Sequence, residues 1–248
     1  MSETATYLNF SMRHRQGTLA FDAAFALSRP WTVLFGPSGS GKTTVLRAIA
    51  GLMRPDEGRV VWRGAVETTW FESADGTFLP AYRRGVRLAA QVAALFPSRT
   101  VRQNIAYGVP SASAAIVDEA LERFHLTGLA ESMPWKLSGG ERQRVAVARA
   151  AASAITVETG SLLLLDEPFA GLHLSLRDEL LDDLRGWLAA RKTPVLSVTH
   201  DVGEAFQLDA EVIKFADGRV VEQGPVETVL AEERTRLMEQ LSRLQQKR

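Results

Sequence analysis

The sequence predicts an α/β fold built around a mostly parallel β-sheet, and three apolar segments with polar ends carry this prediction. Residues 32–35 (Thr-Val-Leu-Phe) indicate a buried strand that passes through a glycine-rich loop into a helix at residues 44–50. Residues 162–165 are four leucines, as expected of a central parallel strand, and two carboxylates follow. Residues 194–198 form a third apolar run that ends in Thr-His-Asp. Because the carboxyl ends of parallel strands share one edge of a sheet, the polar groups there are expected to form one site.

The glycine-rich loop fits the phosphate-binding pattern G-x-x-x-x-G-K-[ST] at every position. Backbone N–H groups of such a loop face the phosphates, and the dipole of the following helix also favours an anion. Lys42 would add a point charge near the outer phosphates, and the Thr43 hydroxyl suits Mg²⁺. The alternative is an ordinary glycine-rich connection, but the flanking strand and helix favour a P-loop NTPase core. The residues assigned to nucleotide binding in this loop are Gly36, Pro37, Ser38, Gly39, Ser40, Gly41, Lys42, Thr43 and Thr44.

Composition narrows the classes of function. The 248 residues are 46% hydrophobic, which is enough for a sizeable core. Basic and acidic residues both total 29, so no net basic field argues for nucleic acid. The absence of cysteine excludes a disulfide framework and thiolate chemistry. No signal peptide is visible, and the apolar runs fall far short of the ~20 residues needed to cross a bilayer. Any membrane association is therefore expected to come through a partner.

Several other segments have predicted structures. Residues 7–12 and 18–22 predict a hairpin, the start of an N-terminal antiparallel β subdomain. Residues 64–85 are interpreted as a surface excursion, for the most part an exposed hairpin without function. Residues 88–91 indicate a short strand ending in the amide of Gln91. Residues 226–248 are expected to form a charged, solvated helix.

An inserted α-helical subdomain is predicted at about residues 95–140, where the composition turns helical and alanine-rich. It ends in Leu-Ser-Gly-Gly-Glu-Arg-Gln at residues 137–143. There a serine and two glycines open a helix, which gives a second helix N-terminus suited to an anion.

Two strand ends supply candidates for chemistry. Asp166 would hold Mg²⁺ through water, and Glu167 would orient or deprotonate an attacking water; the alternative is a pair of solvated turn acids. His200 follows the next core strand. A lone histidine is more often a structural hydrogen-bonding group, but this position favours contact with a γ-phosphate or an attacking water.

Taken together, these motifs give the chain a resemblance to ATP-binding subunits of ABC transporters over nearly its whole length. The phosphate loop, Gln91, residues 137–143, the Asp166-Glu167 pair and His200 occur in that family's order and spacing. The resemblance implies one ABC ATPase domain at 1–248 that uses ATP and Mg²⁺. It also implies a head-to-tail homodimer in which each ATP lies between the phosphate loop of one subunit and the signature run of the other.

By position, the resemblance also implies a role for each motif residue. Lys42 and Thr43 would bind phosphate and Mg²⁺, Asp166 would hold Mg²⁺, and Gln91 would sense Mg²⁺ and water. Glu167 would be the general base and His200 the switch. Ser138, Gly139 and Gly140 would reach the γ-phosphate of the ATP held by the partner. Residues 91–107 would dock with a membrane permease. The subunit would thus sit on the cytoplasmic face of the inner (plasma) membrane, with a solute-binding protein as an indirect partner.

The type of transporter is indicated by two further stretches. Residues 95–97 with 101–108 are similar to bacterial importer ATPases, and Phe-Leu-Pro at 78–80 looks most like molybdate and tungstate importers. Sulfate, other oxyanions and unrelated solutes stay open as cargo. Many of those subunits carry a C-terminal regulatory domain, and the chain is expected to end too early to hold one.

The rival class is a soluble, non-transport ABC ATPase acting on a macromolecular partner, which usually shows paired cassettes or a coiled-coil insertion. A small-molecule P-loop kinase would lack the signature run.

The chain departs from the family pattern at several places. Residues 13–15 (Arg-His-Arg) stand where an aromatic ring usually stacks on adenine, and a planar guanidinium or imidazole is the expected substitute. Residues 93–94 are alanines in place of acidic or aromatic side chains. His173 replaces the usual aspartate, and residues 154–160 are slightly long. We have no functional account of that last segment.

Overall fold

The computed structural model describes residues 6–245, and within that range eleven strands form a single sheet in the order β6-β5-β4-β1-β2-β11-β10-β3-β9-β8-β7. The strands are β1 (Leu8–Gln16), β2 (Leu19–Leu27), β3 (Trp31–Phe35), β4 (Glu57–Arg63), β5 (Glu67–Glu72), β6 (Thr77–Phe78), β7 (Val86–Ala89), β8 (Leu162–Asp166), β9 (Val195–Thr199), β10 (Glu211–Ala216) and β11 (Arg219–Pro225). The α-helices are α1 (Lys42–Ala50), α2 (Val101–Ile105), α3 (Ala115–Arg123), α4 (Gly139–Ile155), α5 (Leu174–Ala190), α6 (Val202–Gln207), α7 (Val226–Val229) and α8 (Ala231–Gln245). Short 3₁₀ turns lie at Ala81–Arg83, Ser111–Ser113, Thr127–Leu129 and Pro134–Lys136.

The α/β prediction is confirmed, and the parallel core is continuous with the antiparallel N-terminal strands. The core of the sheet is parallel, with β10, β3, β9, β8 and β7 paired in that order, whereas β1 pairs antiparallel with both β2 and β4. The four strands β3, β9, β8 and β7 end level with one another, since Phe35 is opposite Thr199, Asp166 opposite Val198 and Ala89 opposite Leu165. The segments that follow these strands therefore emerge at one edge of the sheet.

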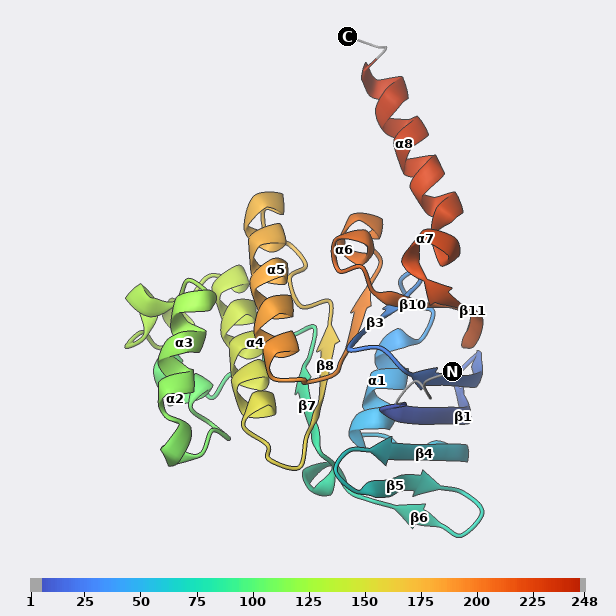
Figure 1. The fold of residues 1–248 in the computed structure, drawn as a ribbon, viewed down its shortest axis with the longest axis horizontal. Helices are drawn as coiled ribbons and strands as arrows, with labels where there is room; N and C mark the ends of the chain where they lie inside the picture. The colour runs from blue at the N-terminus through green and yellow to red at the C-terminus, as the bar shows by residue number, and fades with distance from the viewer. Residues whose placement is uncertain (1–5, 246–248) are drawn as a thin grey trace.

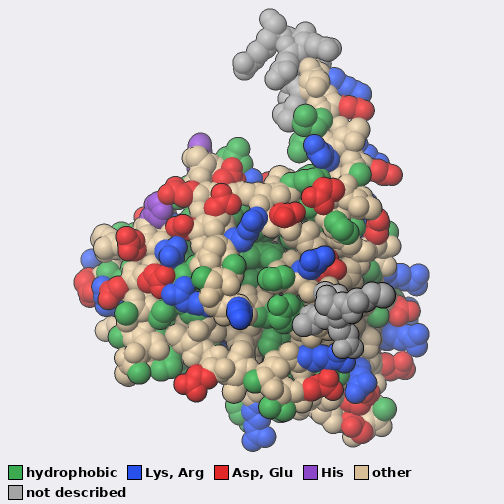
Figure 2. Space-filling view, viewed as in Figure 1, with side chains coloured by type: hydrophobic (Ala, Val, Ile, Leu, Met, Phe, Trp, Pro, Cys, Tyr) green, Lys and Arg blue, Asp and Glu red, His purple; other side chains and the backbone are tan. Residues whose placement is uncertain are grey.

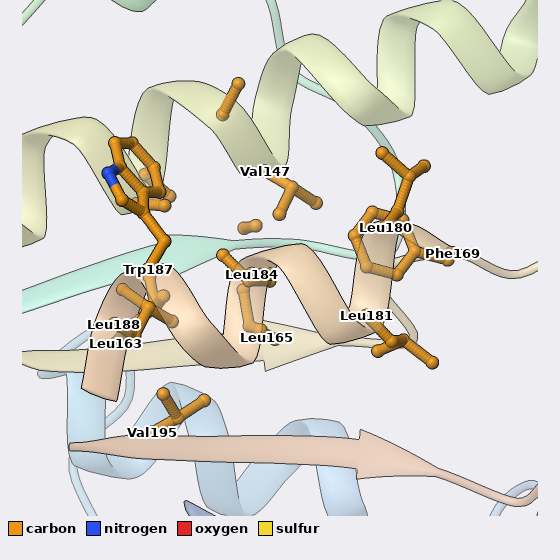
Figure 3. Packing of buried hydrophobic residues seen from close by; sticks show 14 of the residues in the cluster. Val147, Leu163, Leu165, Phe169, Leu180, Leu181, Leu184, Trp187, Leu188 and Val195 are labelled. Atoms are coloured by element: carbon orange, nitrogen blue, oxygen red, sulfur yellow. The ribbon is translucent and has the colours of Figure 1, made fainter. Parts of the chain in front are cut away.

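Helices cover the parallel strands on two faces, which explains the unbroken leucine run. Leu163 and Leu165 of β8 pack in a core with α4 and α5, while Leu162 and Leu164 face a second core that contains α1. Because successive side chains of a strand point to opposite faces, a strand covered on both sides is apolar at every position. In Figure 3, Trp187 and Leu180 of α5 extend toward α4, which carries Val147, and Leu184 lies near Leu165 of β8.

The prediction that residues 64–85 are mostly an exposed hairpin is confirmed in part, because β5 and β6 pair at the edge of the sheet and many residues there are exposed, but the segment also contributes buried side chains. Trp70 and Phe71 of β5 are buried, and the Trp70 ring stacks on that of Trp62 with 5.4 Å between centroids. Arg84 is also buried, with 2% exposure, and donates hydrogen bonds to the carbonyls of Ala48 and Ile49 at the end of α1. β5 extends the sheet and lends its aromatic side chains to the second core, so the segment is structural.

Helices α2 and α3 fall within the predicted helical region at one end of the molecule, beside α4 and α5 (Figure 1). The predicted C-terminal helix is interrupted at Leu230, where α7 gives way to α8, and residues 246–248 lie outside the described residues. α8 projects from the body (Figure 1), and the side chains described along it are largely exposed. Lysine, arginine, aspartate and glutamate side chains are interspersed over the face seen in Figure 2. No helix in residues 6–245 has the length and apolar character needed to span a bilayer.

Candidate functional site: a phosphate loop beside a carboxylate pair

The phosphate loop has the backbone geometry that its glycines predict. Gly39 and Gly41 have φ of 81° and 102°, which L-residues rarely adopt, and Gly41 is the N-cap of α1. A Cβ at Gly36 would lie 2.0 Å from the carbonyl oxygen of Phe215, so no larger residue fits there. The loop thus brings its N–H groups and the N-terminus of α1 to the edge of the sheet where the parallel strands end. The Oγ of Ser40 is buried without a hydrogen-bond partner in the described chain.

Lys42 is buried beneath this loop. Its ammonium donates to the carbonyl oxygens of Gly36 at 2.8 Å and Pro37 at 2.7 Å. Burial lowers the pKa of Lys42, while the charges of Glu167 and Asp166 act in the opposite direction. The two neutral carbonyl groups are weak partners for the positive charge of Lys42, and a negatively charged phosphate oxygen would be a stronger partner.

Thr43 and Asp166 meet beside the loop, with the Thr43 hydroxyl donating to Oδ2 of Asp166 at 2.9 Å. Burial raises the pKa of Asp166 and the Glu167 charge adds to this, whereas the hydrogen bond from Thr43 and the charge of Lys42 oppose it. A hydroxyl beside a buried carboxylate fits Mg²⁺, which in nucleotide sites takes one or two protein ligands and completes its shell with phosphate and water. Among residues 6–245, no cluster of three or more His, Asp or Glu side chains could hold a metal by itself.

Glu167 is held at both carboxylate oxygens. Nε2 of Gln91 donates to Oε2 at 3.2 Å, and Nδ1 of His200 lies 3.1 Å from Oε1. Glu167 has a φ of 48°, an uncommon conformation for a residue with a side chain. Residues that follow strands β7, β8 and β9 thus converge on one carboxylate next to the phosphate loop, in the way the strand ends predict. Such local strain is often found at functional sites.

A cavity of about 440 Å³ joins these groups, and its lining includes Lys42, Thr43, Gln91, Asp166 and Glu167. The signature residues Ser138, Gly139 and Gly140 are absent from that lining. Ser138 instead caps α4, accepting from the Glu141 N–H while Glu141 accepts from the Ser138 N–H. A larger cavity of about 630 Å³ lies near the amino end of β3, beside Trp31, and contains none of the predicted site residues.

Two residues of the N-terminal strands also line this cavity. They are Gln16 and Leu19, whereas residues 13–15, whose side chains were expected to substitute for an aromatic ring, are not part of the lining. His14 turns to Asp56, with 3.0 Å between Nδ1 and Oδ2, and Arg13 turns to Asp22 at 3.4 Å. Strand alternation alone could not have indicated this, since His14 and Gln16 share one face of β1, and it is the Asp56 carboxylate that holds the His14 ring.

Sequence reasoning also missed the network behind His200. Thr199 donates to the buried Glu204 at 2.7 Å, and the Asp201 N–H donates to Thr199 Oγ1 at 3.0 Å. Arg177 of α5 pairs with Asp201. His173 is the N-cap of α5, and its Nδ1 lies 3.0 Å from the hydroxyl of Ser175.

An aromatic and cationic cluster lies at the predicted docking segment. The rings of Phe96 and Tyr107 are 4.5 Å apart, and the guanidinium groups of Arg99 and Arg149 lie 5.3 Å and 5.2 Å from the Phe96 ring centroid. Asn104, fully buried, accepts from the Phe96 N–H at 2.8 Å and so fixes this segment to α2. Tyr107 is half exposed.

Comparisons with known proteins agree with this geometry. A family model described as ABC transporter matches residues 26–170. The molybdenum import ATP-binding protein ModC of Mesorhizobium japonicum is 38% identical over 88% of this chain and 58% of its own length. The molybdate/tungstate import ATP-binding protein WtpC of Archaeoglobus fulgidus is 37% identical over 95% of this chain and 94% of its own length. The chain thus spans about three fifths of ModC and nearly all of WtpC. A solved structure described as an ATP-binding subunit of an ABC transporter has the same fold, with a TM-score of 0.74, 24% identity and coverage of 92% of this chain and 93% of that one.

Proposed function

The chain belongs to the ABC transporter family, and from this membership we propose that it binds ATP with Mg²⁺ and hydrolyses the ATP to power a membrane importer. The observation that carries the hydrolytic part is the Glu167 carboxylate, held between Gln91 and His200 next to Thr43 and Lys42. Phosphoryl transfer to water needs mainly positioning and charge stabilisation, and this cavity offers both.

In the proposed mechanism, loop N–H groups and the N-terminus of α1 bind the phosphates, and the Lys42 ammonium exchanges its two carbonyl partners for phosphate oxygens. Glu167 accepts a hydrogen bond from the attacking water and takes its proton as the water oxygen bonds to the γ-phosphorus, while the bond from that phosphorus to the β,γ-bridging oxygen breaks and ADP leaves. Gln91 and His200 hold that carboxylate in place. Mg²⁺ would be held by Thr43, by Asp166 through water and by Gln91, and would neutralise phosphate charge.

We also propose a head-to-tail homodimer. Ser138, Gly139 and Gly140 lie outside the cavity of their own subunit, at the N-terminus of the 17-residue helix α4. A helix N-terminus with two glycines suits an anion, so these residues would close on the γ-phosphate of the ATP held by a partner.

The cargo and the location follow from the relatives' names and from the cluster around Phe96. ModC and WtpC are named as import proteins for molybdenum and for molybdate/tungstate, so molybdate or tungstate is the proposed cargo. The Phe96 and Tyr107 rings are an apolar surface of the kind that docks a partner helix, here one of the permease. The subunit would then sit on the cytoplasmic face of the inner (plasma) membrane and depend indirectly on a solute-binding protein. The soluble, non-transport alternative is not favoured by these relatives.

The test is molybdate uptake by vesicles that contain the permease expressed with this chain. We expect ATP-dependent uptake that is lost with Glu167→Gln. ATP hydrolysis without association with the permease would refute the transport role and leave the ATPase role intact.

A further inference from the structure

The nucleotide cavity has two chemically different ends. Asp166, Glu167 and Gln91 line one end, where the proposed function places the terminal phosphate. Gln16 and Leu19, from β1 and β2, line the cavity next to Thr44 and Gly41 of the phosphate loop. A nucleotide whose γ-phosphate lies at Glu167 and whose inner phosphates lie on the loop therefore directs its ribose and base toward Gln16 and Leu19.

The base end contains no aromatic side chain among the described residues that line the cavity. The Phe21 ring has 3% exposure and packs against the loop, where a Cβ at Gly41 would lie 2.3 Å from its Cε1 atom. His14 is directed to Asp56, Arg13 to Asp22 and Glu57, and Arg15 lies on the face of β1 opposite to that of Gln16. The apolar surface left for the base is the Leu19 side chain, which also approaches Gly41.

Gln16 supplies the polar group at this end, and its hydrogen bonding limits what it can recognise. Its Oε1 accepts from the Thr44 hydroxyl at 3.1 Å, so Nε2 is the group left to face a ligand. An amide N–H₂ only donates. Adenine and guanine both offer acceptor nitrogens, and guanine also offers an acceptor where adenine carries its amino group. A donor at this position therefore has no means of preferring adenine.

We propose that Leu19 and the amide of Gln16 hold the base without aromatic stacking, and that the chain consequently binds ATP and GTP with similar affinity. This inference rests on the proposed nucleotide function and extends it to how the site discriminates between adenine and guanine. Stacking on an aromatic ring strengthens binding of a base by about 5- to 150-fold, because the ring offers a large flat contact. The triphosphate then supplies most of the affinity here.

The experiment is calorimetric titration of the full chain with ATP, GTP and inorganic tripolyphosphate. We expect the dissociation constants of ATP and GTP to agree within tenfold, and tripolyphosphate to bind within about tenfold of ATP. ATP binding more than tenfold tighter than GTP would overturn the inference while leaving the ATPase role in place. Failure of all three ligands to bind would instead refute the proposed nucleotide site.

Two variants sharpen the test. Leu19→Trp should tighten ATP and GTP about tenfold by supplying a ring, with tripolyphosphate unchanged. Val66→Trp, at an exposed site on the β4–β5 turn, is the matched control and should change none of the three. Gln16→Met, which removes the donor without adding a ring, should weaken ATP and GTP by the same factor. Loss of affinity for ATP alone in Gln16→Met would contradict the assignment of Gln16 as a non-discriminating donor.

Discussion

Nη1 of Arg177, in the first turns of α5, lies 2.5 Å from Oδ2 of Asp201, the residue directly after His200. The other oxygen of Asp201 accepts from the Glu204 N–H at 3.1 Å, and its own N–H donates to Thr199. The backbone on both sides of His200 is thus fixed, and α5 is tied to the segment that places Nδ1 beside Glu167.

Arg177→Met should therefore lower the rate of ATP hydrolysis about tenfold while leaving the ATP dissociation constant unchanged, because His200 loses its support and the phosphate loop does not. Arg177→Lys should restore part of the rate. The matched control is Arg63→Met, which breaks an exposed ion pair with Glu67. A parallel loss of ATP affinity in Arg177→Met would show a general structural role instead of a positioning one.

Glu167→Gln should slow hydrolysis by roughly 10²-fold or more, because an amide cannot take the proton of the attacking water. ATP binding should persist, since Lys42 and the loop are untouched. Lys42→Ala should give the opposite pattern, with weaker ATP binding, because the ammonium at the loop is lost. Rates measured with the permease present and affinities measured by titration separate the two effects. Near-normal hydrolysis by Glu167→Gln would remove this residue from the role of base.

Asp166→Asn should stabilise the nucleotide-free protein at neutral pH even though it impairs function. Burial raises the pKa of Asp166, so its contribution to stability is greatest below the unfolded value of 3.8 and is lost as pH rises through the folded value. At pH 7 the buried charge therefore costs free energy, and the amide avoids that cost while still accepting from Thr43. We expect a melting temperature higher by ~2–4 °C, equivalent to about 1 kcal/mol.

The stability difference for Asp166→Asn should shrink as the pH falls, because the raised pKa of Asp166 lets the folded protein take up the proton that removes the buried charge. Asp209→Asn, at an exposed turn, is the control and should leave the melting temperature unchanged. A less stable Asp166→Asn protein at pH 7 without nucleotide would contradict this electrostatic account.

Arg84→Met should destabilise the fold by about 3 kcal/mol. The Arg84 guanidinium donates to the carbonyls of Ala48, Ile49, Leu79 and Trp70, and burial lowers its pKa to about 10. Methionine fills the volume but leaves these buried acceptors unpaired, including two at the end of α1. Its neighbour Arg83, exposed beside Tyr82, provides the matched control, and Arg83→Met should change stability by less than ~0.5 kcal/mol. Chemical denaturation of both variants measures the difference, and equal effects would rule out the carbonyl contacts as the cause.

Local pattern predicted the convergence of groups at this edge of the sheet because each of them follows a core strand whose register is fixed by burial on two faces. Gln91, Glu167 and His200 are far apart in sequence, yet the level ends of β7, β8 and β9 bring them together. Arg84 and the base end of the cavity were missed for another reason. The local sequence around Arg84 is glycine-rich and charged and does not show that aromatic rings and free carbonyls surround this side chain. Arg84 is buried because the β5–β6 hairpin brings it back to the end of α1. The contrast between Gln16 and His14, which share one face of β1, likewise depends on a distant partner, the Asp56 carboxylate beside the His14 ring.

Phe96→Asp should detach the subunit from membranes that contain the permease. The Phe96 ring contacts Tyr107 and lies under Arg99 and Arg149 at a partly exposed surface fixed to α2 by Asn104. A carboxylate there would be desolvated on docking, and it would draw the two guanidinium groups away from the aromatic surface. ATP binding by the free chain should survive, because the phosphate loop does not touch this cluster. The control is Val221→Asp, which adds a charge at an exposed site on β11. After co-expression with the permease, the membrane-bound fraction should fall several-fold for Phe96→Asp alone, and an unchanged fraction would exclude Phe96 from the docking surface.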